Sequence, residues 1–255
     1  MTPRATILSL LLAPLVLYAF ACAMLFFTQR NLLYFPVARH NPGVPVEALA
    51  VPGGPVRVSV RTQAGPKAVV YFGGNAEDVS LTVPVLALAF PDHAVHALHY
   101  RGYGGSPGSP NERDNVADAL ALFDRVHAAH PQVTLVGRSL GSGVAVQVAG
   151  ARPVERLVLV TPYDAMNEVA ASHYPFFPVR WLVLDRYESV RIAPNLEVPT
   201  TLIAAERDQI IPMASTQRLL AAFRPGVARL VVLPGEDHNS FGDEPAYLAA
   251  LRGTP

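Results

Sequence analysis

Apolar positions along the chain follow two patterns that alternate from about residue 56 to the end. Short runs of β-branched and aliphatic residues predict buried strands, and the longer segments between them have the apolar period of an amphipathic helix. The clearest helix is predicted over 111–130, with apolar positions Val116, Ala119, Leu120, Phe123 and Val126. Strands are predicted at Val56–Arg61, Ala68–Phe72, Ala94–Tyr100, Val133–Val136, Leu157–Val160, Thr200–Ala204 and Leu230–Leu233. This alternation predicts an α/β fold with a mostly parallel, doubly wound sheet.

The first thirty residues form a separate apolar segment. Between Thr6 and Phe27 the chain carries no charged residue, and about 20 such residues in a helix span a hydrocarbon core of roughly 30 Å. We therefore predict that residues 1–30 form a membrane anchor, a single transmembrane helix. A cleaved signal peptide is the alternative, because Ala19-Phe20-Ala21 resembles a cleavage site, although the apolar run continues beyond it. A lipoprotein signal at Cys22 fits less well, since Ala stands three positions earlier where Leu is expected.

Two further segments depart from the alternating pattern. Residues 31–55 are rich in Pro and Gly and predict a linker, which makes 56–255 the α/β domain. Residues 162–190 are too long and too aromatic for a simple crossover helix. We interpret them as a small cap above the carboxyl ends of the strands, where open α/β sheets bind ligands. Candidate residues for an apolar substrate pocket in this cap are Tyr163, Phe176, Phe177 and Trp181. A packed crossover with surface aromatics is the alternative.

Composition narrows the partners of the chain. The formal net charge is zero and the basic residues do not cluster, which argues against nucleic acid, because phosphate binding needs a concentrated basic surface. The single cysteine, Cys22, excludes an intrachain disulfide and a Cys-rich metal site. His93, His96 and His99 do not form a metal cluster, because strand residues three apart face opposite sides. Gly141-Ser142-Gly143 lacks the third Gly of a dinucleotide fingerprint. We therefore predict neither a metal nor a cofactor.

Gly137-Arg138-Ser139-Leu140-Gly141 matches the pattern G-x-S-x-G. Ser139 follows the strand predicted at Val133–Val136 and precedes a helix predicted at Gly141–Ala149, which is the strand–turn–helix setting of a nucleophile elbow. A serine hydroxyl is a weak nucleophile, so it needs a base within hydrogen-bond reach and a third group that orients the base. Without such partners, Ser139 is only a small residue in a tight turn.

Two residues supply those partners in the sequence. Asp208 and His238 follow the last two predicted strands, so both are expected at the same edge of the sheet as Ser139. The chain order Ser139, Asp208, His238 is that of the α/β-hydrolase triad. A turn or a helix cap is the alternative role for each residue. The other candidates for the acid are Glu206, Asp237 and, more seriously, Asp164.

Acyl transfer also needs hydrogen-bond donors for the tetrahedral oxyanion. The N–H of Leu140, the residue after the nucleophile, is the first candidate. The second is expected from the loop after the strand Ala68–Phe72, where Gly73-Gly74 precedes Asn75. We predict the N–H groups of Asn75 and Leu140 as the oxyanion hole; a simple strand-ending turn is the alternative for the Asn75 loop.

Several motifs resemble the Bem46-like branch of the α/β-hydrolase superfamily, which also contains the α/β-hydrolase domain-containing proteins 13 and 17. They are "VVYFGGNAEDV", "LHYRGYGGSPGSPNE", "GRSLGSGVA", "YPFFPVRWL", "VPTTLIAAERDQIIP" and "GEDHN". The resemblance covers the chain from about Asn31 to the end and implies an α/β-hydrolase fold with Ser139, Asp208 and His238 as the triad. The family often has His-Gly-Asn-Ala at the oxyanion loop; here Gly73 replaces that His, and any hydrogen bond from its side chain is absent.

Together these features predict a membrane-anchored serine hydrolase that acts on a small-molecule acyl substrate, an ester or thioester, through an acyl-enzyme. A serine peptidase or amidase of the same fold is one alternative, and a non-catalytic scaffold that binds a lipid or protein is another. Basic residues are nearly all Arg, which hints at a bacterial source. The short amino terminus then favours an inner-membrane protein with a periplasmic catalytic domain, although Arg4 faces Arg30 and Arg39 across the span.

Overall fold

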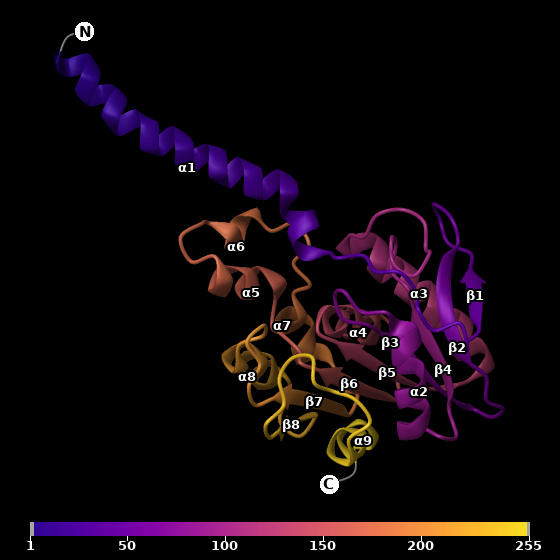
Figure 1. Ribbon diagram of the computed structural model, residues 1–255. Helices are drawn as coiled ribbons and strands as arrows, with labels where there is room; N and C mark the ends of the chain where they lie inside the picture. Colours follow the sequence, from indigo (N-terminus) through magenta and orange to yellow (C-terminus); the bar gives the residue numbers. More distant parts are fainter. Residues whose placement is uncertain (1–2, 254–255) are drawn as a thin grey trace.

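The computed structural model describes residues 3–253, with side chains described from Leu12 onward, so the start of the predicted 1–30 segment and the end of the predicted 56–255 segment lie outside it. A long N-terminal helix projects from an α/β body (Figure 1). The strands are β1 (Val46–Leu49), β2 (Val56–Arg61), β3 (Lys67–Phe72), β4 (Ala94–Leu98), β5 (Gln132–Arg138), β6 (Arg156–Val160), β7 (Thr200–Ala205) and β8 (Ala228–Leu233). The helices are α1 (Pro3–Leu33), α2 (Val79–Ala89), α3 (Glu112–Ala129), α4 (Leu140–Ala151), α5 (Met166–His173), α6 (Val179–Leu182), α7 (Ser189–Ile192), the 3-10 helix η1 (Ala193–Asn195), α8 (Met213–Ala222) and α9 (Pro245–Arg252).

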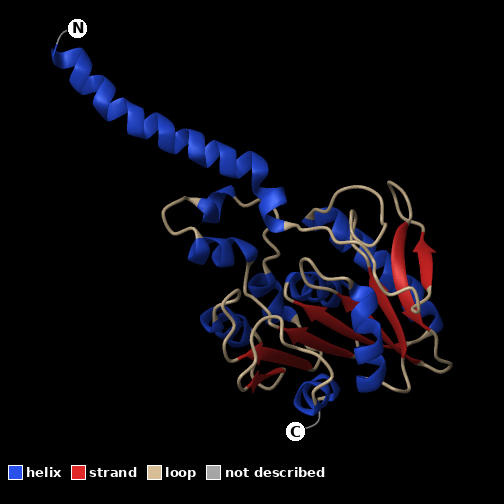
Figure 2. Ribbon diagram, viewed as in Figure 1, coloured by secondary structure: helices blue, strands red, loops and turns tan. Residues whose placement is uncertain are grey.

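The strands form one sheet in the order β1-β2-β4-β3-β5-β6-β7-β8 (Figure 2). β1 and β2 run antiparallel to their neighbours, whereas β4, β3, β5, β6, β7 and β8 pair in parallel. Every parallel connection passes over a face of the sheet through a helix, as parallel pairing requires. The predicted α/β fold with a mostly parallel sheet is confirmed.

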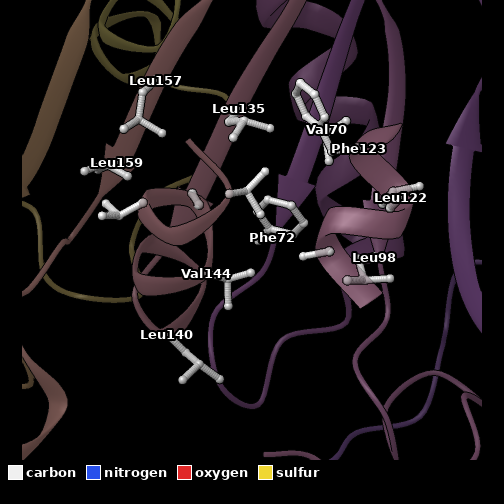
Figure 3. Packing of buried hydrophobic residues seen from close by; sticks show 14 of the residues in the cluster. Val70, Phe72, Leu98, Leu122, Phe123, Leu135, Leu140, Val144, Leu157 and Leu159 are labelled. Atoms are coloured by element: carbon white, nitrogen blue, oxygen red, sulfur yellow. The ribbon is translucent and has the colours of Figure 1, made fainter. Parts of the chain in front are cut away.

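Helices cover both faces of the sheet because its central strands are apolar on both sides. In β3, Val70 and Phe72 face the layer of α3 and α4, where Phe123 and Val144 pack against them (Figure 3). The intervening residue Tyr71 faces the opposite layer, which contains α2 and α9. The carboxyl ends of the central strands are therefore held in place by packed helices on both faces of the sheet.

The predicted linker over 31–55 is folded in part into the domain. α1 continues to Leu33, Tyr34 is buried, and β1 pairs with β2 in the register Val46↔Ser59. The domain therefore begins before the predicted boundary at residue 56. The sequence does not indicate this because β1 has only four residues, of which Leu49 alone is buried. So short an edge strand, set among Pro and Gly, lacks a readable alternation.

α1 has the length and composition of a membrane span. Its segment Leu12–Leu33 has 22 residues, a mean hydropathy of 1.8 and no part buried inside the protein. A signal sequence near an amino terminus has the same properties. The predicted cap consists of α5, α6 and the loops around them, and it lies beside the C-terminal half of α1 (Figure 1).

Candidate active site

Ser139 lies in a strained turn between β5 and α4. Its φ of +48° is uncommon for a residue with a side chain. The turn is held by a hydrogen bond of 2.8 Å from the Ser139 N–H to the Val160 carbonyl, and by the Ser142 hydroxyl, which donates to the Ser139 carbonyl over 2.7 Å. Such strain persists only where the surroundings impose it, and it is common at functional sites.

The two glycines of the motif allow the close packing that this turn needs. A Cβ at Gly137 would lie 2.4 Å from the Gly141 carbonyl oxygen, and one at Gly141 would lie 2.0 Å from the Phe72 carbonyl oxygen. Both obstacles are backbone atoms that cannot move aside as a side chain can. Gly137 and Gly141 are therefore required by the fold of the elbow, and they bring the start of α4 against the end of β3.

The structure brings Ser139, His238 and Asp208 together from three separate strand ends. The His238 Nε2 atom is 3.0 Å from the Ser139 hydroxyl, and its Nδ1 atom is 2.8 Å from an Asp208 carboxylate oxygen. The other Asp208 oxygen accepts the N–H groups of Ile210 and Ile211 over 2.9 and 2.8 Å. Ser139 and His238 are each 8% exposed, so the pair is shielded but reachable from solvent. This arrangement can accept a proton from the hydroxyl at one end of the imidazole and fix its tautomer at the other.

None of the other candidate acids hydrogen-bonds the His238 side chain in the described part of the chain. Asp164 accepts hydrogen bonds from the Ser215 hydroxyl and the Arg218 guanidinium, both on α8. Glu206 accepts the N–H of Gly235, and Asp237 caps its own loop through the Asn239 N–H. The carboxylate that orients His238 is that of Asp208.

The loop after β3 lies directly beside the nucleophile. A Cβ at Gly74 would lie 3.6 Å from that of Ser139, so the two backbones are close neighbours. The N–H of Leu140 is the first of α4 and has no partner in the helical ladder. The Asn75 N–H makes no hydrogen bond within the described part of the chain. Both predicted oxyanion donors thus remain available for a ligand.

The Asn75 side chain has a separate structural role. Its amide donates to the Leu33 carbonyl over 2.7 Å, and its oxygen accepts from the Phe35 N–H and the Tyr103 hydroxyl over 2.9 and 2.8 Å. The loop after β3 is therefore fastened to the end of α1.

A buried ion pair between Glu77 and Arg138 connects the loops around the site. Glu77 accepts the Gly74 N–H over 2.6 Å and lies 2.9 Å from the Arg138 guanidinium. Arg138 in turn donates to the His238 carbonyl over 2.9 Å and to the Asn239 side chain over 3.0 Å. Burial alone would raise the pKa of Glu77, but Arg138 and the other hydrogen-bond donors bring it below its usual range. Both groups stay charged, and they hold the loop after β3 and the loop of His238 to the turn at Ser139.

Sequence reasoning missed this pair, although a signal was present. An Arg inside the nucleophile motif and a Glu in the loop after a buried strand both stand where charge is costly to bury. Two opposite charges in such places are expected to be partners. Among the residues whose side chains are described, no group of three His, Cys, Asp or Glu is arranged to hold a metal ion.

The predicted pocket residues do not line the apolar groove that lies between α1 and the cap. Tyr163 is fully buried under α4, where its hydroxyl donates to the Leu140 carbonyl, so its assignment to a pocket is wrong. Phe176 and Trp181 point outward and are 85% and 78% exposed, and Phe177 stacks on Tyr18 of α1. The correction has a physical reason: aromatic side chains serve cores, pockets and membrane surfaces equally well.

A groove of about 490 Å³ instead lies between α1 and the cap, and we call it the α1–cap groove. Its lining residues are Leu25, Gln29, Leu32, Leu33, Met166, Val169, Ala170, His173, Tyr174, Val179, Leu182 and Val183. Two of them contact loops of the site: the Leu33 carbonyl accepts from Asn75, and His173 bonds the Ile210 carbonyl beside Asp208. The groove is therefore adjacent to the loop that carries Asn75 and to the loop that carries Asp208.

Comparisons with known proteins agree with this fold. The family model for the alpha/beta hydrolase fold matches residues 67–191. An uncharacterised protein of Mycobacterium tuberculosis is 35% identical over 231 residues, which cover 83% of this chain and 80% of the relative.

Solved structures extend the comparison. Est1E from Butyrivibrio proteoclasticus with bound ferulic acid has a TM-score of 0.66 at 13% identity, over 81% of this chain and 96% of its own. Mouse alpha/beta hydrolase domain-containing protein 10 has a TM-score of 0.65 at 18% identity, and the match covers 82% of this chain and 96% of the mouse protein. The monoacylglycerol lipase of Paleococcus ferrophilus has a TM-score of 0.59 at 18% identity, and the match covers 78% of this chain and 98% of the lipase. At these identities the likeness shows the fold alone. With the strand order and the family model matched over residues 67–191, it shows that the chain has the alpha/beta hydrolase fold.

Proposed function

We propose that this protein is a membrane-anchored serine hydrolase that cleaves an ester or thioester of an acyl chain. The observation that carries the proposal is the continuous hydrogen-bonded series from the Ser139 hydroxyl through His238 to Asp208. The motifs shared with Bem46-like hydrolases support the same reading, with Ser139, Asp208 and His238 at the positions of the triad.

The proposed reaction proceeds in two steps. His238 takes the hydroxyl proton through Nε2 while the Ser139 oxygen attacks the substrate carbonyl, and Asp208 stabilises the imidazolium through Nδ1. The N–H groups of Leu140 and Asn75 donate to the oxyanion of the tetrahedral intermediate. His238 then gives its proton to the leaving alcohol or thiol. A water molecule, deprotonated by the same imidazole, releases the acyl group from Ser139.

The α1–cap groove is the proposed site for the acyl chain. Its walls are mostly aliphatic, and its size falls within the range of ligand pockets. An amide substrate differs only in its leaving group, so a peptidase is the main competitor. An aminopeptidase must also hold a free amine, and the lining of the groove contains no carboxylate.

Covalent labelling tests the nucleophile. A fluorophosphonate probe is expected to label the wild-type chain and to fail on Ser139→Ala, because the hydroxyl that forms the phosphonyl ester is gone. Ser172→Ala on α5 is the matched control and should label normally. A folded wild-type chain that resists the probe, or a Ser139→Ala variant that still reacts, would overturn the proposal.

Substrate profiling tests the acyl groove. Ala170 lines the groove and Ala171, the next residue of α5, does not. Ala170→Phe should lower kcat/KM for long-chain p-nitrophenyl esters by about tenfold or more, since each methylene that loses burial costs about 0.8 kcal/mol, and should spare the acetate ester. Ala171→Phe should leave the chain-length profile unchanged. Faster hydrolysis of aminoacyl anilides than of any ester would favour a peptidase.

A further inference from the structure

The outer surface of the cap carries exposed aromatic and aliphatic side chains within a short stretch of sequence. They are Tyr174, Phe176, Trp181 and Leu184, which we call the cap apolar surface. Single exposed apolar residues are ordinary on soluble domains, but four of them between positions 174 and 184 are typical of an interaction surface. Trp and Tyr are also the residues enriched where membranes meet water.

This surface is joined directly to α1. The Tyr18 hydroxyl donates to the Phe176 carbonyl over 3.0 Å, and the Tyr18 ring stacks on Phe177 with centroids 5.8 Å apart. Nearer the domain, Gln29 donates to the Leu182 carbonyl over 3.2 Å and accepts the Leu184 N–H over 2.7 Å. The cap therefore follows the helix over about three turns, from Tyr18 to Gln29, and it lies beside α1 in Figure 1.

The length of α1 sets the depth of these contacts. Tyr18 lies 15 residues after the first residue of the helix, Pro3. At 1.5 Å per residue that distance is about 22 Å. A hydrocarbon core is about 30 Å thick, so a helix that enters it at its first turn leaves it roughly 8 Å beyond Tyr18. The cap residues that touch Tyr18 cannot then lie in bulk water.

We infer that the cap apolar surface inserts into the interfacial layer of the lipid bilayer, on the side where α1 emerges. The depth agrees with the roughly 5–10 Å at which interfacial segments bury their apolar face. Three polar backbone groups of the loop that face α1 are also satisfied by helix side chains, as a low-dielectric environment requires. The inference requires α1 to be retained as the anchor.

The contact with lipid also concerns the α1–cap groove. Tyr174 belongs both to the cap apolar surface and to the lining of the groove. The groove is thus adjacent to the bilayer, and an acyl chain can pass into it laterally from the lipid. This consequence rests on the proposed function, whereas the insertion itself does not.

The chain supplies its own probe for the insertion. Trp181 is the single tryptophan of the sequence. The full chain, reconstituted in phosphatidylcholine–phosphatidylglycerol vesicles, should show blue-shifted Trp181 emission. That emission should be quenched strongly by lipids brominated close to the headgroup and less by lipids brominated at the chain end. Emission does not depend on catalysis, so Ser139→Ala should give the same result.

A matched control places the only tryptophan on the opposite part of the domain. In the double variant Trp181→Phe with Leu88→Trp, the new indole replaces an exposed residue of α2, which lies far from α1 in Figure 1. Its emission should stay at the wavelength of a hydrated indole and resist the brominated lipids. Equal quenching at both positions would show non-specific contact and overturn the inference.

Three other results would also overturn it. Vesicles that float without the protein would show that α1 does not anchor the chain. A vesicle-bound chain whose Trp181 emission stays water-like and unquenched would retain the anchor but place the cap in solvent. Blue-shifted emission that brominated lipids leave unchanged, together with cross-links between caps, would show the surface buried against a second copy instead.

Discussion

Glu77 and Arg138 carry opposite charges into the layer beneath the proposed catalytic residues, with side chains 9% and 16% exposed. Neither takes part in the proposed reaction. Their hydrogen bonds reach the Gly74 N–H on one side and the His238 carbonyl on the other, so the pair connects the predicted oxyanion loop to the loop of His238. Removing one partner of such a pair is costly because the remaining charge stays buried.

We therefore expect Glu77→Gln to lower kcat on the order of 10- to 100-fold while KM changes little, since small displacements of a catalytic group have effects of this size. The measurement is steady-state kinetics on a soluble ester, normalised to folded protein. Asp118→Asn is the matched control, because it breaks an equally buried ion pair with Arg101, which also contacts Pro52 beside the β1–β2 turn. Equal kcat losses in the two variants would reduce the Glu77 pair to a stability role.

His99 at the end of β4 links stability to pH. It is 2% exposed and bonds the Ser59 hydroxyl over 2.8 Å, and burial lowers its pKa from 6.5 to about 4. Between about pH 6.5 and 4, His99 binds a proton in the unfolded chain but not in the folded chain. The free energy of unfolding should therefore fall as the pH drops through this range and become constant below it. The loss from this residue is on the order of 3 kcal/mol. Urea unfolding across this range should give a shallower decline for His99→Gln; an unchanged slope would contradict the assignment.

At the scale of elements, the period of apolar residues located all seven predicted strands, but it gave both ends correctly only for β2. The strand predicted at Ala94–Tyr100 stops at Leu98, because Tyr100 is buried by packing although its backbone has left the sheet. At the edge, β8 begins at Ala228, two residues before its apolar run, since pairing with β7 continues where burial does not. Hydrophobicity reports burial, and strand bounds are set by hydrogen bonds.

The cap shows a second limit of sequence patterns. Its position after β6 and its aromatic content were visible, but the direction of each ring was not. Tyr163 lies three residues after the end of β6 and is buried beneath α4. Phe176 follows α5 and is exposed to solvent. Contacts between α1 and the cap join residues more than 150 positions apart, and no local pattern encodes them.

At the scale of the whole molecule, parallel topology made the proposed catalytic residues predictable. Ser139, Asp208 and His238 each follow a strand, and strands that run the same way bring their carboxyl ends to one edge. Chain order and residue type were therefore enough to place the three side chains together. The ion pair of Glu77 and Arg138 depends instead on the contact between the loop after β3 and the turn at Ser139, and only the folded chain shows that contact.

With α1 as the proposed anchor, its orientation decides on which side of the membrane the proposed active site lies. Arg4 before the apolar run of α1 stands against Arg30 and Arg39 after it, so the flanking charge is nearly balanced. The orientation predicted from the sequence exports the domain. The only cysteine lies within the span, so nothing in the domain opposes an oxidising compartment. Alkaline phosphatase fused to the carboxyl terminus and expressed in bacteria should then be active, because that enzyme folds only after export. The same fusion to residues 31–255 is the control and should stay inactive in the cytoplasm. An inactive but stable fusion of the full chain would place the hydrolase domain on the cytoplasmic side instead.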